Sequence, residues 1–148
     1  MKKVVVLGCG LVGGVMTRDL AADPNIEVTA VDLSEKNLGE VRQWPRVRAM
    51  KADLSSAHEI ARAVRDADAV VGAVPGRIGF AMLRTVIESG KPIADISFAP
   101  EDPMQLDAAA KAKGVTAVVD CGVSPGLSNL AIGRAAAPLG ALASAVIN

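Results

Sequence analysis

The chain has 148 residues, which is enough for one ordinary domain with a sizeable core. Its 16 Lys and Arg residues balance its 16 Asp and Glu residues, so its net charge favours neither nucleic acid nor an anionic membrane as a partner. Its aromatic residues are 2 Phe, 1 Trp and no Tyr, which leaves almost no platform for stacking nucleic-acid bases.

The first elements along the chain are a strand, a glycine turn, a helix and a second strand. Residues 3–7 form a short β-branched run, as expected for a buried strand, and Gly8–Gly13 follows with the pattern G-x-G-x-x-G. Residues 11–22 are expected to be helical, and the next strand, residues 26–31, ends at Asp32. Along that helix the apolar residues recur at the spacing of a core-facing stripe; they are Leu11, Val12, Val15, Met16 and Leu20.

This order of elements gives each glycine a role in binding a dinucleotide. Gly8 permits a tight turn, Gly10 lets a pyrophosphate approach the backbone, and Gly13 lets the helix pack closely on the strand. The N–H groups at the helix start attract phosphate. Asp32, 19 residues after Gly13, can accept hydrogen bonds from both ribose hydroxyls and repels a 2′-phosphate, so NAD is favoured over NADP. Lys36 is the nearby cation that keeps NADP as an alternative.

The same N-terminal segment has some features of an export signal, because two lysines precede an apolar run that contains Cys9. Glycines interrupt that run, no A-x-A cleavage site follows it, and it is shorter than the ~20 residues that span a bilayer. We therefore interpret Cys9 as a small buried residue. With 2 Cys and 1 His in the chain, we expect no metal site and a cytoplasmic protein.

The rest of the sequence alternates helices and strands. Ser34 is expected to cap one helix, and Ser55 or Ser56 to cap the next, which ends near Arg65. The other helices are expected at residues 35–43, 78–89, 101–113 and 127–137, and the other strands at residues 47–51, 68–74, 92–96, 115–119 and 142–147. This alternation predicts an α/β fold with a doubly wound parallel sheet, that is, a Rossmann-type domain.

Ligands of such sheets bind beyond the carboxyl ends of the strands, so the residues that follow each strand form the candidate site. Asp53 and Leu54 are expected near the adenine, with a helix-capping carboxylate as the alternative for Asp53. Residues 73–76 are expected to border the nicotinamide ribose, with a simple turn as the alternative. The candidate cofactor-binding residues are Gly8, Cys9, Gly10, Leu11, Val12, Gly13, Asp32, Leu33, Asp53, Leu54, Ala73, Val74 and Pro75.

The segment VVDCGVSPGLSNLAIG, residues 118–133, contains more than a nucleotide site requires. Glycines and a proline bend the chain just before a helix, and such a helix start can bind an anionic group such as a substrate carboxylate. A structural turn capped by Ser124 or Ser128 is the alternative, and the residues alone leave both open. The candidate substrate-binding residues are Gly122, Pro125, Gly126 and Asn129.

Four segments together resemble the saccharopine dehydrogenase-like family, and within it the lysine 6-dehydrogenases: VVVLGCGLVG, VDLS, KADLSS and GVSPGLSNLAIG. They occur in the family's order across essentially the whole chain, and G-V-x-P-G-x-x-N is far more specific than the glycine fingerprint. The resemblance implies an NAD(P)-binding Rossmann domain, followed by an α/β domain that closes the substrate pocket and forms a homodimer. It also implies hydride transfer to or from nicotinamide at the C–N bond of a small amino-acid substrate.

Family members are several hundred residues long, whereas this sequence stops at Asn148. We therefore expect residues 1–137 to be the dinucleotide-binding domain, residues 138–148 to begin a second domain, and this chain alone to be inactive. Asp95 and Asp120 are the candidates for the catalytic base, with caps or turn acids as the alternative for both. Two other functions remain: a regulatory NAD-binding module like those of potassium channels, and a reductase similar to dihydrodipicolinate reductase.

Overall fold

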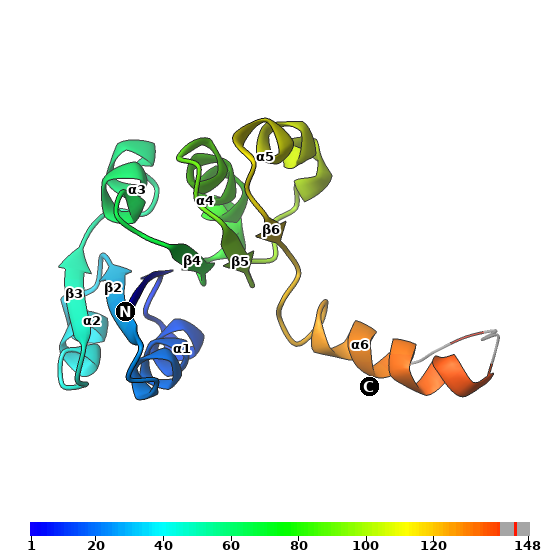
Figure 1. Ribbon diagram of the computed structural model, residues 1–148, viewed down its shortest axis with the longest axis horizontal. Coiled ribbons are helices and arrows are strands. Elements are labelled where there is room, and N and C mark those ends of the chain that lie inside the picture. The colour runs from blue at the N-terminus through cyan, green and yellow to red at the C-terminus, as the bar shows by residue number, and fades with distance from the viewer. Residues whose placement is uncertain (140–143, 145–148) are drawn as a thin grey trace.

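The computed structural model describes residues 1–139 and residue 144. Six parallel strands form one sheet in the order β3-β2-β1-β4-β5-β6 (Figure 1). The strand order reverses between β1 and β4, which confirms the predicted doubly wound sheet and places its crevice there. The strands are β1 (Lys2–Leu7), β2 (Ile26–Asp32), β3 (Val47–Lys51), β4 (Ala69–Gly72), β5 (Ile93–Asp95) and β6 (Ala117–Val118).

Helices cover both faces of the sheet: α1 and α2 lie on one face, and α3, α4 and α5 lie on the other, while α6 projects away from the β6 edge (Figure 1). Within the described part of the chain, no helix has the length and apolar character needed to cross a membrane. The α-helices are α1 (Leu11–Ala22), α2 (Glu35–Val41), α3 (Ala57–Val64), α4 (Gly76–Glu88), α5 (Asp107–Lys113) and α6 (Leu127–Ala136). Two short 3₁₀ helices are η1 (Pro103–Leu106) and η2 (Ala137–Leu139).

Strand β1 is apolar from Val4 to Leu7 because these residues are buried on both faces of the sheet. Val5 and Leu7 face the layer of α3, α4 and α5, where they join a cluster that includes Ile60 of α3. Val6 points to the opposite face and packs with Ala21 of α1. A parallel strand that is buried on both faces has no polar side to alternate with, so its sequence becomes a continuous hydrophobic run.

Several predicted helix ends are confirmed by their hydrogen bonds. The Ser34 side chain caps α2 by accepting from the Asn37 N–H, and Ser56 caps α3 by accepting from the Glu59 N–H. Gly114 ends α5 with a φ of 64°, a left-handed conformation that glycine adopts without steric cost. Local capping chemistry thus positions the helices on the sheet.

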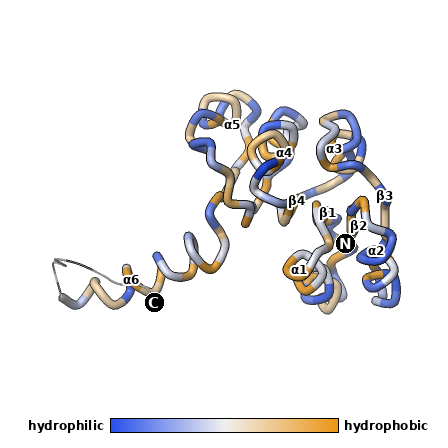
Figure 2. Tube along the Cα trace, turned by 180° about the vertical axis from the view of Figure 1, so that it is seen from behind, coloured by the Kyte–Doolittle hydropathy of each residue, from blue (hydrophilic) through white to orange (hydrophobic). Residues whose placement is uncertain are grey.

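The buried face of α1 differs from the prediction, although both ends of the helix agree with it. Leu11, Val12 and Val15 are 96%, 54% and 53% exposed, and Figure 2 shows this hydrophobic stretch in orange. The face turned to the sheet carries Gly13 and Thr17, with Ala21 one turn further on. Small residues are needed there because α1 approaches the strands too closely for large side chains.

Other boundaries also differ from the sequence-based expectation. The single helix expected at residues 101–113 is divided: η1 begins at Pro103, and α5 begins only at Asp107. Strands β4, β5 and β6 are shorter than predicted, because β5 pairs with β4 over three residues and with β6 over two. Apart from residue 144, the strand expected at residues 142–147 lies outside the described residues, and so does most of the expected second-domain segment 138–148.

Candidate functional site

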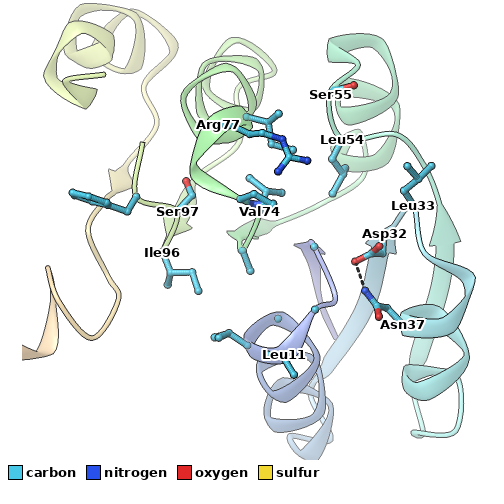
Figure 3. A pocket seen from close by; sticks show the side chains of 18 of the residues that line it. Leu11, Asp32, Leu33, Asn37, Leu54, Ser55, Val74, Arg77, Ile96 and Ser97 are labelled. Carbon is cyan, nitrogen blue, oxygen red and sulfur yellow. Dashed lines mark hydrogen bonds between the residues drawn. The ribbon is translucent and has the colours of Figure 1, made fainter. Parts of the chain in front are cut away.

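A cavity of about 800 Å³ opens at the carboxyl edge of the sheet, where the strand order reverses (Figure 3). This volume is in the range of ~300–1,000 Å³ that is usual for small-molecule sites. Every candidate cofactor-binding residue except Cys9 lines it, namely Gly8, Gly10, Leu11, Val12, Gly13, Asp32, Leu33, Asp53, Leu54, Ala73, Val74 and Pro75. The fold therefore brings residues from four strand ends together at one site.

The glycine turn forms the floor of the cavity through close backbone packing. Gly8 has a φ of 96°, and a Cβ there would meet the carbonyl of Ala73. A Cβ on Gly13 would collide with the carbonyl of Gly8, so α1 can lie against β1 only with glycine at this position. Around Gly10, by contrast, no described atom lies within 4 Å of an added Cβ. That open space faces the cavity.

Two helix N-termini lie at this cavity, those of α1 and α4. Among the described side chains none caps either helix start, at Gly10 and at Pro75, whereas serines cap α2 and α3. First-turn N–H groups have no intrahelical acceptor, and the dipole places partial positive charge there. The cavity is therefore suited to a phosphate or another anion.

The Asp32 carboxylate joins the glycine turn to the start of α2. Its Oδ2 accepts the Cys9 N–H at 2.7 Å and the Asn37 side-chain amide at 3.3 Å, and its Oδ1 accepts the Ser34 N–H at 2.7 Å (Figure 3). A carboxylate has about four acceptor positions. Oδ1 thus has capacity for a further donor from a ligand.

Cys9 is buried beside the turn, and its thiol lies 3.6 Å from the Val31 carbonyl oxygen as a weak donor. Burial, and secondarily the negative charge of Asp32, raise the pKa of this thiol to about 12. The side chain therefore fills space as a neutral thiol, as the sequence predicted.

Thiol labelling distinguishes the two cysteines. At pH 8 we expect Cys121, which is exposed, to react with a disulfide reagent in the native protein, and Cys9 to react only after unfolding. The expected count is one thiol per chain in buffer and two in denaturant, and Cys121→Ser should abolish the native signal. Rapid reaction of both thiols in buffer would contradict the burial of Cys9.

Asp53 lines the cavity within a turn before α3. Its Oδ1 accepts hydrogen bonds from the N–H and the hydroxyl of Ser55, at 2.9 and 2.7 Å, and these bonds lower the pKa of Asp53. The alternative that Asp53 caps α3 is wrong, because Ser56 has that role. Asp53 is therefore a turn acid whose carboxylate stays charged at the edge of the cavity.

Seven further residues line the cavity that were not among the candidates from the sequence, and one of them, Arg77 at the start of α4, is the only cation among the described lining residues. Figure 3 shows Arg77 reaching from α4 toward the middle of the cavity, near Val74 and Leu54. Pro75 and Gly76 at the end of β4 were the available signal for this helix start. Lys36 lies in a groove beside Trp44 that shares Gly10, Leu11 and Asn37 with this cavity. The missed residues are Asn37, Ser55, Arg77, Ile78, Ile96, Ser97 and Phe98.

The two candidate bases lie outside this lining. Asp95 is 3% exposed, and its carboxylate accepts hydrogen bonds from the Ser97 N–H and hydroxyl. Burial raises the pKa of Asp95, with the neighbouring charge of Asp120 adding to the shift. Asp120 is exposed, with a φ of 57°, and shares a separate small cavity with Asp95. Asp95 ends β5 and Asp120 follows β6, so both acids lie at the carboxyl ends of strands, as expected. Neither lines the cavity that the candidate cofactor-binding residues form.

Three of the candidate substrate-binding residues, Gly122, Pro125 and Gly126, lie in a tight turn before α6, and the fourth, Asn129, lies in the first turn of α6. The Gly126 N–H donates to the Asn129 side-chain oxygen at 3.0 Å, and a Cβ on Gly126 would collide with the Gly122 carbonyl. The suggested caps Ser124 and Ser128 are wrong for α6, because Asn129 closes its start. Pro125 lies within this turn, which approaches the cavity near Ile96: an added Cβ on Gly122 would lie 3.8 Å from the Ile96 carbonyl oxygen.

Solved structures share this fold at low sequence identity. Saccharopine dehydrogenase (L-Glu forming) from Saccharomyces cerevisiae superposes with a TM-score of 0.81 at 21% identity, over 91% of this chain and 30% of that one. GenD2 from gentamicin A biosynthesis, in complex with NAD, gives 0.65 at 24% identity over 80% of this chain and 34% of that one. Biliverdin reductase from Synechocystis sp. PCC 6803, in complex with biliverdin and NADP⁺, superposes with a TM-score of 0.65 at 19% identity, over 79% of this chain and 37% of that one.

The chain thus spans about a third of the length of these structures. At such identities the likeness shows the fold alone. A family model gives the assignment: the saccharopine dehydrogenase NADP binding domain matches residues 4–118, which include the glycine turn, Asp32, β1 from Val4 onward and the other five strands. The chain therefore belongs to the saccharopine dehydrogenase family of NAD(P)-binding oxidoreductase domains.

Proposed function

We propose that the cavity at the β1–β4 crevice binds a nicotinamide adenine dinucleotide and prefers NAD to NADP. The observation that carries the proposal is that Asp32 and the Gly8–Gly13 turn line the same cavity. In this arrangement the free acceptor position on Asp32 Oδ1 accepts a hydrogen bond from an adenosine ribose hydroxyl, and the diphosphate lies against the first turn of α1. The nicotinamide half extends toward Val74 and Ile96.

Two features of the cavity fit such a ligand. Gly10 lines the cavity at the start of α1, and an added Cβ there would meet no described neighbour within 4 Å, so the backbone is open to a diphosphate. The uncapped N-termini of α1 and α4 supply N–H donors and positive dipole ends to the same anion. Arg77 adds a full positive charge on the α4 side.

The preference for NAD follows from the charges near Asp32. A 2′-phosphate on the adenosine ribose would add negative charge beside Asp32, with the Asp53 carboxylate on the same cavity wall. Two nearby cations are paired, because Arg42 lies 3.1 Å and Lys51 lies 3.9 Å from the Glu35 carboxylate. Lys36 lines an adjoining groove that shares Gly10, Leu11 and Asn37 with the cavity but does not include Asp32. Asp32 and Asp53 are thus the charged residues that line the ribose end of the cavity itself.

We further propose that the full protein acts on the C–N bond of an amino acid. The support is the G-V-x-P-G-x-x-N segment, which approaches the end of β5 next to the cavity. When bound, the nicotinamide ring supplies the acceptor or the donor of a hydride. The turn of Gly122 and Gly126 would present the first turn of α6, with Asn129, to the substrate carboxylate. Asp120, the exposed acid at this edge, is the candidate for accepting the amine proton.

A homodimer of the full protein is also a proposal. Its support is the exposed apolar surface near α6, where Leu127 and Leu130 are 63% and 73% exposed. A contiguous apolar surface of this kind commonly marks a contact with another domain or subunit.

The substitution Gly10→Ala tests the cofactor site without disturbing the fold. The backbone at Gly10 has a φ of −69°, which alanine adopts freely, and an added methyl would meet no described atom within 4 Å. We therefore expect an unchanged midpoint of urea unfolding. We expect NADH affinity to fall by about tenfold or more, equivalent to ~1.4 kcal/mol, because the methyl takes the place of the diphosphate. Undiminished NADH binding by this variant would sink the proposed site.

A further inference from the structure

We infer that Asp95 is a positioning residue for the cofactor: through Ser97 it fixes segment 96–98, which forms the cavity wall opposite Asp32. The inference rests on the proposed function and adds a role for a buried acid that does not itself line the cavity. Figure 3 shows Ile96 and Ser97 on the β5 side of the cavity and Asp32 on the β2 side. With the adenosine at Asp32, segment 96–98 is the wall available to the nicotinamide half.

Hydrogen bonds to the Asp95 side chain and backbone fix the position of this segment. The Ser97 N–H donates to Asp95 Oδ1 at 3.1 Å, and the Ser97 hydroxyl donates to Oδ2 at 2.5 Å. The Asp95 carbonyl accepts the Cys121 N–H at 3.1 Å, and the Ile96 N–H donates to the Gly72 carbonyl at 3.0 Å. Asp95 and Ser97 are both buried, so these bonds are shielded from competing water.

Three glycines on two neighbouring elements leave room for the same segment. A Cβ on Gly72 of β4 would overlap Asp95 Oδ1, and a Cβ on Gly79 of α4 would overlap the Ser97 hydroxyl. A Cβ on Gly76, also of α4, would overlap the Phe98 carbonyl. We call Gly72, Gly76 and Gly79 the glycine socket. The three glycines lie against three different groups of residues 95–98. The glycine socket therefore fixes how closely that segment packs on β4 and α4.

This arrangement makes a prediction that separates the two halves of the cofactor. ADP-ribose contains the adenosine, the diphosphate and the second ribose but lacks the nicotinamide ring. A displaced segment 96–98 should weaken binding of NADH, which reaches that wall, and leave ADP-ribose binding largely intact. General destabilisation of the fold would weaken both ligands equally, so the ratio of the two affinities reports positioning alone.

The test uses calorimetric titration of the chain with NADH and with ADP-ribose, and NADH fluorescence as a second reading of the ring environment. For Asp95→Ala and for Gly79→Ala we expect NADH affinity to fall by about tenfold, the scale of one buried hydrogen-bonding group left without its partner. We expect ADP-ribose affinity to change by less than about twofold. Asp95→Asn should restore NADH binding, because its amide can accept from the Ser97 N–H and donate to the hydroxyl.

The matched control is Gly39→Ala, also a glycine inside a helix, with no described atom within 4 Å of its added Cβ. It should leave both affinities unchanged. If Asp95→Ala fails to fold, Gly79→Ala makes the comparison, because its added Cβ displaces Ser97 without changing a residue that lines the cavity. Equal loss of both ligands, or full NADH affinity in the folded variants, would overturn the inference while the proposed function stands. A native chain that binds neither ligand would overturn the proposed function and this inference together.

Discussion

Replacing Asp32 with alanine is expected to lower NADH affinity by about 10- to 100-fold while changing NADPH affinity much less, because a hydrogen bond to a charged group contributes ~1.5–3 kcal/mol. In the proposed complex Asp32 accepts a hydrogen bond from a ribose hydroxyl of NADH and repels the 2′-phosphate of NADPH. Removal of the carboxylate deletes both effects. The preference for NADH should therefore narrow or disappear, as measured by parallel fluorescence titrations.

Asp32 also has a structural role that the experiment must separate from binding. Its carboxylate holds the Cys9 and Ser34 N–H groups, so Asp32→Ala loosens the glycine turn as well. A loosened turn lowers the affinities for NADH and NADPH by the same factor, whereas loss of ribose recognition changes the ratio of the two affinities. An unchanged ratio of NADH to NADPH affinity would show that Asp32 only stabilises the glycine turn. Circular dichroism should show that the variant remains folded.

Replacing Gly13 with alanine is expected to destabilise the protein by about 3 kcal/mol and to abolish detectable NADH binding, since overpacking of a tight contact costs ~1–3 kcal/mol or more. The added Cβ would overlap the Gly8 carbonyl, with Ala73 also in contact. Helix α1 must then move away from β1, and its first turn moves with it. The loss of stability can be measured by urea unfolding followed by the fluorescence of Trp44, which packs against the buried cluster of Cys9, Ala30 and Val41.

Gly14→Ala is the matched control, one residue along the same helix. Its Cβ would lie 3.5 Å from the Cys9 carbonyl oxygen, an ordinary van der Waals contact. Alanine is favoured over glycine inside a helix by about 1 kcal/mol, so this variant should be as stable as the native protein or more so. Equal stability of the Gly13 and Gly14 variants would show that α1 does not depend on close packing at Gly13.

The elements of the fold could be predicted from sequence because each carries a local signal. Helix α1 begins and ends where expected, since its limits follow from the glycine turn and from Asp23 and Pro24. Its buried face could not be predicted from the apolar stripe. The close contact of Gly13 with Gly8, which the glycine pattern did predict, and with Ala73 after β4 selects the face with small residues. Only the folded sheet brings Ala73 next to Gly13.

The same distinction applies to the candidate site. The glycine turn and Asp32 are close in sequence to the elements that place them, so their common cavity could be expected. Arg77 was missed because α4 begins two residues before the predicted start, which places its side chain over the cavity. The role of Asp95 depends on the glycine socket, and no local pattern links Gly72 or Gly79 to Ser97 before the strands pair.

The most direct test of the central claim is a fluorescence titration of the unaltered chain with NADH and with NADPH under identical conditions. The arrangement of Asp32 and the glycine turn at one cavity predicts saturable binding of both, with NADH bound about tenfold or more tightly, a difference of ~1.4 kcal/mol. Equal affinities, tighter binding of NADPH, or no binding of either dinucleotide would contradict it.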